Sequence, residues 1–256
     1  MSTISVERDG RTAVVTIERP ERRNAVDGET AWALYEAFKA FDADESLDVA
    51  ILQGRGGNFC AGADLKSVST GSGDNPVKPE GELGPMGCTR LKLGKPVIAA
   101  VEGYAVAGGL EVACWCDLRV AAEDAVFGVF CRRFGVPLVD LGTVRLPRLI
   151  GHSRAMDLIL TGRPVAADEA FQIGLANRIA PKGGALEVAL ELARQLSAFP
   201  QLCMRNDRLS ALAQWSLGWD EAQAVEYRFG IETLRSGSAR EGAGRFVSGQ
   251  GRGGAF

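Results

Sequence analysis

The residue types best suited to chemistry lie in one stretch, Gly103–Arg119, which reads GYAVAGGLEVACWCDLR. A glycine pair, Gly108 and Gly109, follows an apolar run, and one carboxylate, Glu111, comes three residues after Gly108. If a helix begins at the pair, its first N–H groups have no intrahelical partner and lie at the positive end of the helix dipole. Gly108 and Glu111 then share a helix face, so a donor for an oxyanion and a group for proton transfer converge. This suits chemistry on a carbonyl compound. The alternative is a tight turn that leaves Glu111 in solvent.

The length and charge of the chain limit the classes of function. A chain of 256 residues can form one large domain, or a domain with a helical appendage. The formal charge of −3 provides no general basic surface, so no nucleic-acid partner is expected. No apolar run reaches the roughly 20 residues of a membrane span. The first residues also lack the pattern of a signal peptide. We therefore predict a cytoplasmic protein with no membrane contact.

The cysteines and the single histidine narrow the choice further. Six cysteines occur without a CxxC pair, and Cys114 and Cys116 lie in an apolar context typical of core packing. This favours reduced thiols in a cytosolic protein. The only histidine, His152, excludes a multi-histidine metal site and lies where a helix is expected to begin. No metal is predicted.

The elements that position these residues alternate between strand and helix in the first half of the chain. Asp9-Gly10 predicts a hairpin between two strands, and Asp27 is a candidate N-cap for a helix over 28–43. A stretch rich in glycine, serine and proline, 67–87, predicts a mobile surface loop. The predicted strands cover residues 3–7, 13–18, 49–53, 96–101, 118–121 and 126–128. This order indicates a layered α/β core.

The chain becomes helical from about residue 143. Apolar residues at helical spacing predict helices over 153–160, 167–171, 184–196, 201–213 and 220–236. The glycine-rich tail, 249–256, is expected to be flexible. Seven apolar residues of the last helices exceed what a peripheral appendage can bury alone, which favours an oligomer: Leu209, Leu212, Trp215, Leu217, Trp219, Val225 and Phe229.

Four motifs together resemble the enoyl-CoA hydratase/isomerase (crotonase) superfamily over almost the whole chain. They are RPERRNAVD at 19–27, FCAGADLK at 59–66, KPVIAAVEGYAVAGGLEVACWCDLRVA at 95–121 and LTGRPVAADEAFQIGLANRI at 160–179. The resemblance implies an α/β fold, a spiral of ββα units, with C-terminal helices that build trimers or dimers of trimers. It divides the chain into an acyl-CoA-binding core, 1–195, and an oligomerisation region, 196–256. It also implies an enzyme of fatty acid metabolism whose partner is an acyl-CoA thioester, with coenzyme A as part of the substrate and no other cofactor.

The resemblance assigns two groups of binding residues. The backbone N–H groups of Ala63 and Gly108 correspond to the family's oxyanion hole, and loss of one such donor typically costs about 3–4 kcal/mol of transition-state stabilisation. Two segments correspond to those that carry coenzyme A, and the candidate contacts are Arg23, Ala25, Ala63, Asp64, Leu65 and Lys66.

The catalytic carboxylates match the family pattern only in part. Glu111 corresponds to the first of two glutamates that activate water in hydratases, whereas Cys131 stands where the second is expected. Asp140 lies near the place where dienoyl-CoA isomerases and several acyl-CoA hydrolases have an aspartate. Asp140 is therefore either catalytic or the cap of a helix beginning near Gly142. Cys131 is either a buried filler or a thiol whose pKa is lowered by the arginines that follow it.

Three functions remain open from the sequence. A hydratase-like lyase that forms an oxyanion-stabilised enolate from an enoyl-CoA is the default reading. An enoyl- or dienoyl-CoA isomerase, or an acyl-CoA hydrolase, would use Glu111 and Asp140. An acyl-CoA-binding protein without turnover would explain the missing glutamate.

Overall fold

The computed structural model describes residues 2–71, 73 and 75–250. Their contacts divide the chain into two compact units, one ending at Leu196 and the other beginning at Ser197. No helix within the described residues is long and apolar enough to cross a membrane.

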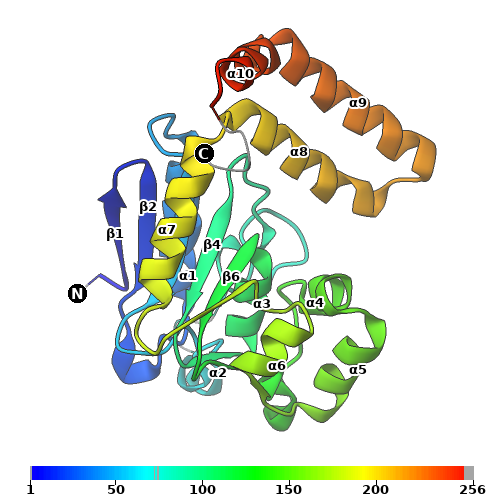
Figure 1. Cartoon of the computed structure of the whole chain (residues 1–256). Helices are drawn as coiled ribbons and strands as arrows, with labels where there is room; N and C mark the ends of the chain where they lie inside the picture. Colours follow the sequence, from blue (N-terminus) through cyan, green and yellow to red (C-terminus); the bar gives the residue numbers. More distant parts are fainter. Residues whose placement is uncertain (1, 72, 74, 251–256) are drawn as a thin grey trace. The chain divides into compact units, whose positions relative to one another are not determined.

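The first unit is built on a six-stranded sheet with the strand order β1-β2-β3-β4-β6-β9 (Figure 1). β1 is antiparallel to β2, and every later pair in this sheet is parallel. The strands are β1 (Ile4–Asp9), β2 (Thr12–Ile17), β3 (Val49–Gly54), β4 (Val97–Val101), β6 (Leu118–Ala122) and β9 (Arg178–Ala180). Helices between the parallel strands are what this connectivity requires, so the predicted α/β fold class is confirmed.

Alternation along the central strands sends side chains to two separate cores. In β3, Ala50 and Leu52 pack in a core on one face of the sheet, whereas Val49 and Ile51 pack on the other. Both cores are fully covered, which explains why the parallel strands read as continuous apolar runs.

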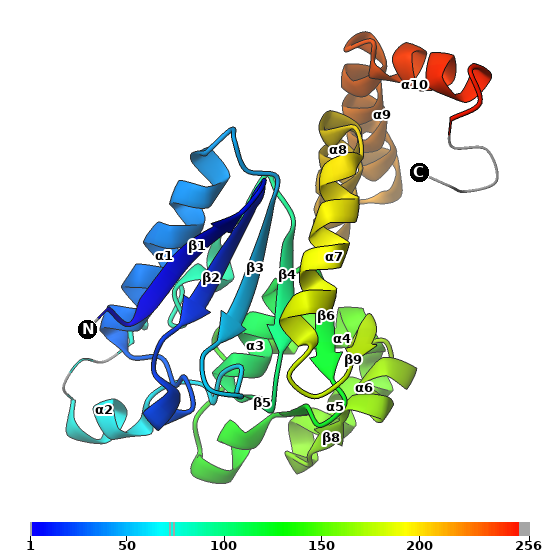
Figure 2. The same cartoon turned by 60° about the vertical axis from the view of Figure 1, so that its left-hand side comes forward.

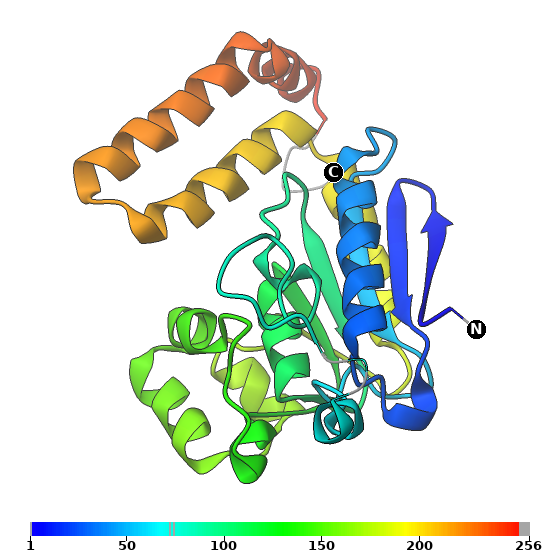
Figure 3. The same ribbon diagram turned by 180° about the vertical axis from the view of Figure 1, so that it is seen from behind.

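The first face is covered by α1 (Gly28–Ala43) and α3 (Gly108–Trp115) (Figure 3). The predicted cap is present, because Asp27 Oδ1 accepts a hydrogen bond of 3.0 Å from the Thr30 N–H. The predicted apolar stripe of α1, consisting of Ala31, Leu34, Phe38 and Phe41, is buried in this core. The opposite face is covered by α7 (Ala185–Ala198), which buries Ala185, Ala189 and Ala193 (Figure 2).

A smaller three-stranded sheet, ordered β5-β7-β8, holds the start of α3. Its strands are β5 (Tyr104–Val106), β7 (Val126–Gly128) and β8 (Val165–Ala166). The other helices of the first unit are α2 (Leu65–Thr70), α4 (Gly142–Ile150), α5 (His152–Thr161) and α6 (Ala167–Gln172), and its short 3₁₀ turns are η1 (Pro20–Arg22), η2 (Cys88–Arg90) and η3 (Phe130–Phe134).

The second unit is helical, as predicted. α8 (Gln201–Ala213) and α9 (Trp219–Arg235) run side by side in Figure 1, joined through η4 (Gln214–Ser216), and α10 (Ser238–Val247) follows. Asn206 links the pair by donating to the Phe229 carbonyl and the Thr233 hydroxyl, at 3.2 and 3.1 Å.

The structure differs from the predicted elements in two helices and three strands. α2 continues to Thr70, so the first residues of the segment predicted as a loop over 67–87 are helical, because the Asp64 side chain caps the helix on the Lys66 N–H. α10 has no counterpart among the predicted helices, and β5, β8 and β9 have none among the predicted strands. The flexible tail predicted over 249–256 lies outside the described residues from 251 onward.

Candidate active site

The turn between β5 and α3 places a helix N-terminus at a cavity. Ala107, the N-cap residue, has φ 54° and ψ −126°, a backbone conformation that residues with a side chain rarely adopt. The turn is held because the Ala107 N–H donates to the Gly128 carbonyl of β7 at 2.8 Å. Strain of this kind persists only where the surroundings enforce it, and it is concentrated at functional sites.

Each glycine of the pair has a close neighbour. A Cβ on Gly108 would lie 2.8 Å from the Met86 sulfur, and one on Gly109 would collide with the Cys60 carbonyl. The Cys60 backbone leaves no room for a side chain at Gly109, whereas at Gly108 the flexible Met86 side chain would have to shift.

Two backbone N–H groups are directed towards the cavity. Gly108 is the first residue of α3, and its N–H has no hydrogen-bond partner among the described residues. Ala63 forms a parallel bridge with Val26 in which the Gly62 carbonyl and the Asp64 N–H bond to Val26, so the Ala63 N–H faces the other side. Both residues line the cavity. The predicted pair of donors is thus brought to one wall.

Glu111 is fixed by the backbone at the start of α4. Its Oε1 accepts hydrogen bonds from the Asp140 N–H at 2.9 Å and the Gly142 N–H at 2.7 Å. The side chain is 2% exposed and lines the cavity, so the alternative in which Glu111 points into solvent is wrong. Its other oxygen, Oε2, has no hydrogen-bond partner among the described residues, which leaves one carboxylate oxygen for a ligand.

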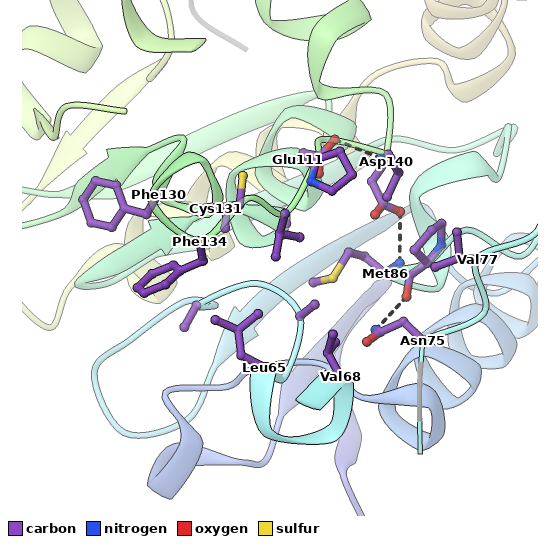
Figure 4. Close-up of a pocket in the computed structure, with 18 residues that line it drawn as sticks. Leu65, Val68, Asn75, Val77, Met86, Glu111, Phe130, Cys131, Phe134 and Asp140 are labelled. Carbon is purple, nitrogen blue, oxygen red and sulfur yellow. Dashed lines mark hydrogen bonds between the residues drawn. The ribbon is translucent and has the colours of Figure 1, made fainter. Parts of the chain in front are cut away.

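Asp140 brings a second buried carboxylate to the same cavity. Its Oδ1 accepts from the Met86 N–H at 2.9 Å and from the Thr89 hydroxyl (Figure 4). Arg145 donates to the Asp140 carbonyl at 3.0 Å and to the Thr89 carbonyl at 2.6 Å, which fixes the backbone around the carboxylate. The helix-cap alternative for Asp140 is wrong, because α4 is preceded by Leu141 at φ 66° and has no side-chain cap.

Burial raises the pKa of both carboxyl groups. Burial, and then the neighbouring Asp140 charge, raise the pKa of Glu111 to about 7 against the hydrogen bonds from the Gly142 and Asp140 backbone. Burial also raises the pKa of Asp140, opposed by the hydrogen bonds from Thr89 and Met86. A carboxyl group with a pKa near neutrality can both accept and release a proton at the working pH.

Cys131 also lines the cavity, but as a protonated thiol. Burial, followed by the nearby Glu111 charge, raises its pKa, so the arginines that follow it in sequence do not activate it. Those arginines are turned away: Arg132 donates to the Ile159 carbonyl, and Arg133 lies over the Phe130 ring and donates to the Gly162 carbonyl.

The cavity itself measures about 440 Å³ and is mostly apolar. Figure 4 shows Leu65 and Val68 of α2 on one side and Phe130 and Phe134 of η3 on another. Four polar side chains line it among the described residues: Asn75, Glu111, Cys131 and Asp140. A pocket of this size and lining fits an acyl group rather than a polar metabolite.

The predicted coenzyme A contacts are divided between the cavity and its surroundings. Ala63 and Leu65 line the cavity, while Arg23 and Lys66 are exposed and not among the lining residues. The Asp64 carboxylate forms an ion pair of 3.0 Å with Arg19, and Arg19 also donates to the Ala25 carbonyl. Arg19 thus connects the segment that contains Ala25 to the segment that contains Asp64. The Asp64 carboxylate serves this connection.

Sequence reasoning missed four residues that shape the site: Asn75, Met86, Thr89 and Arg145. Their partners lie far away in the chain, so no local spacing identifies them. Within the described part of the chain, no group of three or more His, Cys, Asp or Glu side chains is arranged to hold a metal ion.

Comparison with known proteins agrees with this geometry. A family model described as enoyl-CoA hydratase/isomerase matches residues 7–250. The chain is 38% identical to enoyl-CoA hydratase EchA19 of Mycobacterium tuberculosis over 94% of its own length and 92% of the relative's. It is also 38% identical to a carnitinyl-CoA dehydratase of Salmonella arizonae, over 93% and 88%. A crystal structure of enoyl-CoA hydratase EchA1 from Mycobacterium marinum superposes with a TM-score of 0.90 at 37% identity, covering 97% of this chain and 96% of that one.

Proposed function

The chain belongs to the enoyl-CoA hydratase/isomerase family, and on that basis we propose that it adds water reversibly across the C2=C3 double bond of a 2-enoyl-CoA thioester. The observation that carries the proposal is the position of Glu111. One of its oxygens is fixed by two backbone donors, and the other faces a cavity that two further N–H groups also face.

The thioester oxygen would be bound by the Ala63 and Gly108 N–H groups. As the oxygen of water bonds to C3, the electrons of the double bond move onto this oxygen and form an enolate. The two donors and the N-terminus of α3 stabilise that charge more strongly than the neutral thioester. The strained Ala107 turn would hold the Gly108 donor in place before the charge develops.

Glu111 and Asp140 would divide the two proton transfers. One of the two carboxyl groups, when ionised, removes a proton from the attacking water, and the other, when protonated, gives one to C2 as the enolate collapses. The pKa of Glu111 near 7 supports its part in this division, because a carboxyl group near neutrality is populated in both protonation states, and burial raises the pKa of Asp140 as well. Exchange with solvent then resets the pair.

Double-bond isomerisation is the second candidate, and the thiol of Cys131 favours it. Isomerisation moves a proton from C4 to C2 and needs no water held beside C3, so Glu111 and Asp140 would suffice. Thioester hydrolysis would place the same carboxylates beside the carbonyl carbon, and a binding protein without turnover would use the oxyanion donors alone.

The absorbance of the conjugated thioester and the release of free thiol separate turnover from binding alone and from hydrolysis. We expect crotonyl-CoA to lose this absorbance on addition of the protein, and acetoacetyl-CoA to bind saturably by calorimetry. Glu111→Gln should bind acetoacetyl-CoA within a few-fold of the wild type and lose turnover, because it removes only the proton-transfer group. Release of free thiol would indicate a hydrolase instead. Binding without any change in absorbance or thiol would indicate a protein without turnover.

We also propose a homotrimer or a dimer of trimers assembled through the second unit. Its exposed apolar side chains include Trp219, which is 85% exposed, together with Leu212, Trp215, Tyr227, Leu234, Phe246 and Val247. Apolar side chains gathered in this number on one unit mark an interaction surface. Light scattering at micromolar concentration should give three or six times the chain mass, and a monomeric mass would contradict the proposal.

A further inference from the structure

Asn75 carries a cavity-lining polar side chain that the proposed reaction does not use. It is 9% exposed, and its amide nitrogen donates to the Val26 carbonyl at 3.0 Å and the Pro85 carbonyl at 2.9 Å. Its amide oxygen is buried and has no hydrogen-bond partner among the described residues. A buried acceptor without a partner normally costs about 1–3 kcal/mol of stability, so such groups call for an explanation.

The orientation of this amide is set by its neighbours. Both groups that the nitrogen contacts are backbone carbonyls, which can only accept. Rotating the amide by half a turn would bring its oxygen against two carbonyl oxygens and lose both hydrogen bonds. The Asn75 oxygen is therefore the atom left free, and Figure 4 shows the side chain pointing towards Val68.

The Asn75 side chain is linked to the reacting groups through a single peptide unit. The peptide unit whose carbonyl accepts from Asn75 is the same one whose N–H, from Met86, donates to Asp140 at 2.9 Å. Two hydrogen bonds and one peptide unit place the Asn75 nitrogen within about 8 Å of the Asp140 carboxylate. The Val26 carbonyl that Asn75 contacts also accepts from the Asp64 N–H, next to the oxyanion donor Ala63.

We propose that the Asn75 amide oxygen is a specificity subsite that accepts a hydrogen bond from a hydroxyl group on the acyl chain of the substrate. The inference rests on the proposed function, because it places the acyl chain in this cavity. The surroundings of the subsite are apolar, with Val68, Val77 and Pro85 beside it, so an unsubstituted chain would fill the space but leave the acceptor unpaired. A chain with a hydroxyl a few carbons beyond the double bond would pair it.

The test compares hex-2-enoyl-CoA with its three derivatives that carry a hydroxyl on each carbon beyond the double bond. The wild type should prefer at least one hydroxylated substrate by about tenfold in kcat/KM, as expected when a buried acceptor gains its partner. Asn75→Val should remove that preference, so that the hydroxylated and the unsubstituted substrates have similar kcat/KM. Val77→Ala, a matched change beside it, should alter the rates of both substrates by the same factor and keep the preference.

Three results would overturn the subsite. One is a wild type that uses the unsubstituted chain at least as well as every hydroxylated chain, a comparison that does not depend on how the Asn75 variant folds. Another is an Asn75→Val variant that folds but has a kcat/KM lowered by the same factor for all substrates. That result would mean that Asn75 only holds its loop in place. The third is that Asn75→Val weakens the binding of free coenzyme A as much as the binding of the hydroxylated substrate. That result would mean that the Asn75 oxygen accepts from an N–H of the coenzyme.

Binding separates this proposal from the proposed function. Calorimetry with hexanoyl-CoA and its hydroxylated derivatives needs no turnover, and it should show the same tenfold preference. A preference in binding without turnover would support the subsite and contradict the hydratase. Turnover without a preference would support the hydratase and contradict the subsite.

Discussion

Glu111→Gln should stabilise the protein while it removes the activity. In the folded protein the pKa of Glu111 is raised from its ordinary value of 4.5 to about 7. The unfolded chain therefore ionises this group more easily, and the folded state loses stability as the pH rises through that interval. Gln keeps an oxygen that can accept from the Asp140 and Gly142 N–H groups, and it has no charge to bury.

The size of the effect follows from the shift. Each pKa unit corresponds to about 1.4 kcal/mol, so the ionised carboxylate costs the folded state about 3 kcal/mol at pH 8 and about 1 kcal/mol at pH 5. The variant should gain these amounts in free energy of unfolding. Below pH 4.5 the carboxyl group is mostly protonated in both states, and the gain should vanish.

Urea unfolding of the wild type and Glu111→Gln from pH 5 to pH 8, at one protein concentration, measures this difference. Glu187→Gln, a change in the first turn of α7, serves as a control for the removal of a carboxylate elsewhere. A variant that is less stable than the wild type at pH 8, or a gain that does not depend on pH, would refute the reasoning. Either result would mean that the carboxylate is well stabilised where it lies.

Three further changes test the framework of the site. Gly142→Ala should lower kcat about 100-fold with little effect on ligand binding, because its Cβ would lie 2.7 Å from Glu111 Oε1 and displace the carboxylate; steady-state kinetics with unchanged parameters would contradict this. Cys131→Ala should keep most of the activity, since the thiol is protonated, whereas Cys131→Glu should raise hydration if the scaffold lacks only a second glutamate. Arg119→Met should cost about 3 kcal/mol in unfolding free energy, because the buried guanidinium donates to the Ala113, Cys116 and Leu175 carbonyls. The exposed Arg178→Met is the matched control, and equal stability of the two variants would contradict the assignment.

The sequence predicted those parts of the site that depend on local spacing. Gly108 and Glu111 are three residues apart on one helix, and Ala63 lies in a motif beside the cap of α2, so pattern and resemblance sufficed to find them. The α1 cap and stripe were predicted for the same reason. Each depends on neighbours within one or two turns of helix.

The parts that were missed depend on contacts between distant segments. The role of Asp140 stayed open because its partners, Met86 and Thr89, are 54 and 51 residues away. The helix-cap alternative failed because the chain turns through Leu141 at positive φ, a conformation that no pattern in VDLGT indicates. Asn75 lies in a stretch without periodicity, and its two carbonyl partners belong to separate segments.

The dependence of hydration on Asp140 tests the central claim most directly. The measurement is the initial rate of absorbance loss of crotonyl-CoA for the wild type, Asp140→Asn and a surface control, Asp157→Asn. Asn keeps the acceptor for the Met86 N–H and the Thr89 hydroxyl but cannot accept or supply a proton. We expect Asp140→Asn to lose about 10²–10⁴-fold in rate, or roughly 3–5 kcal/mol of barrier, while acetoacetyl-CoA binding and the control stay within a few-fold. Brisk hydration by the wild type that Asp140→Asn leaves unchanged would contradict the account and assign both proton transfers to Glu111.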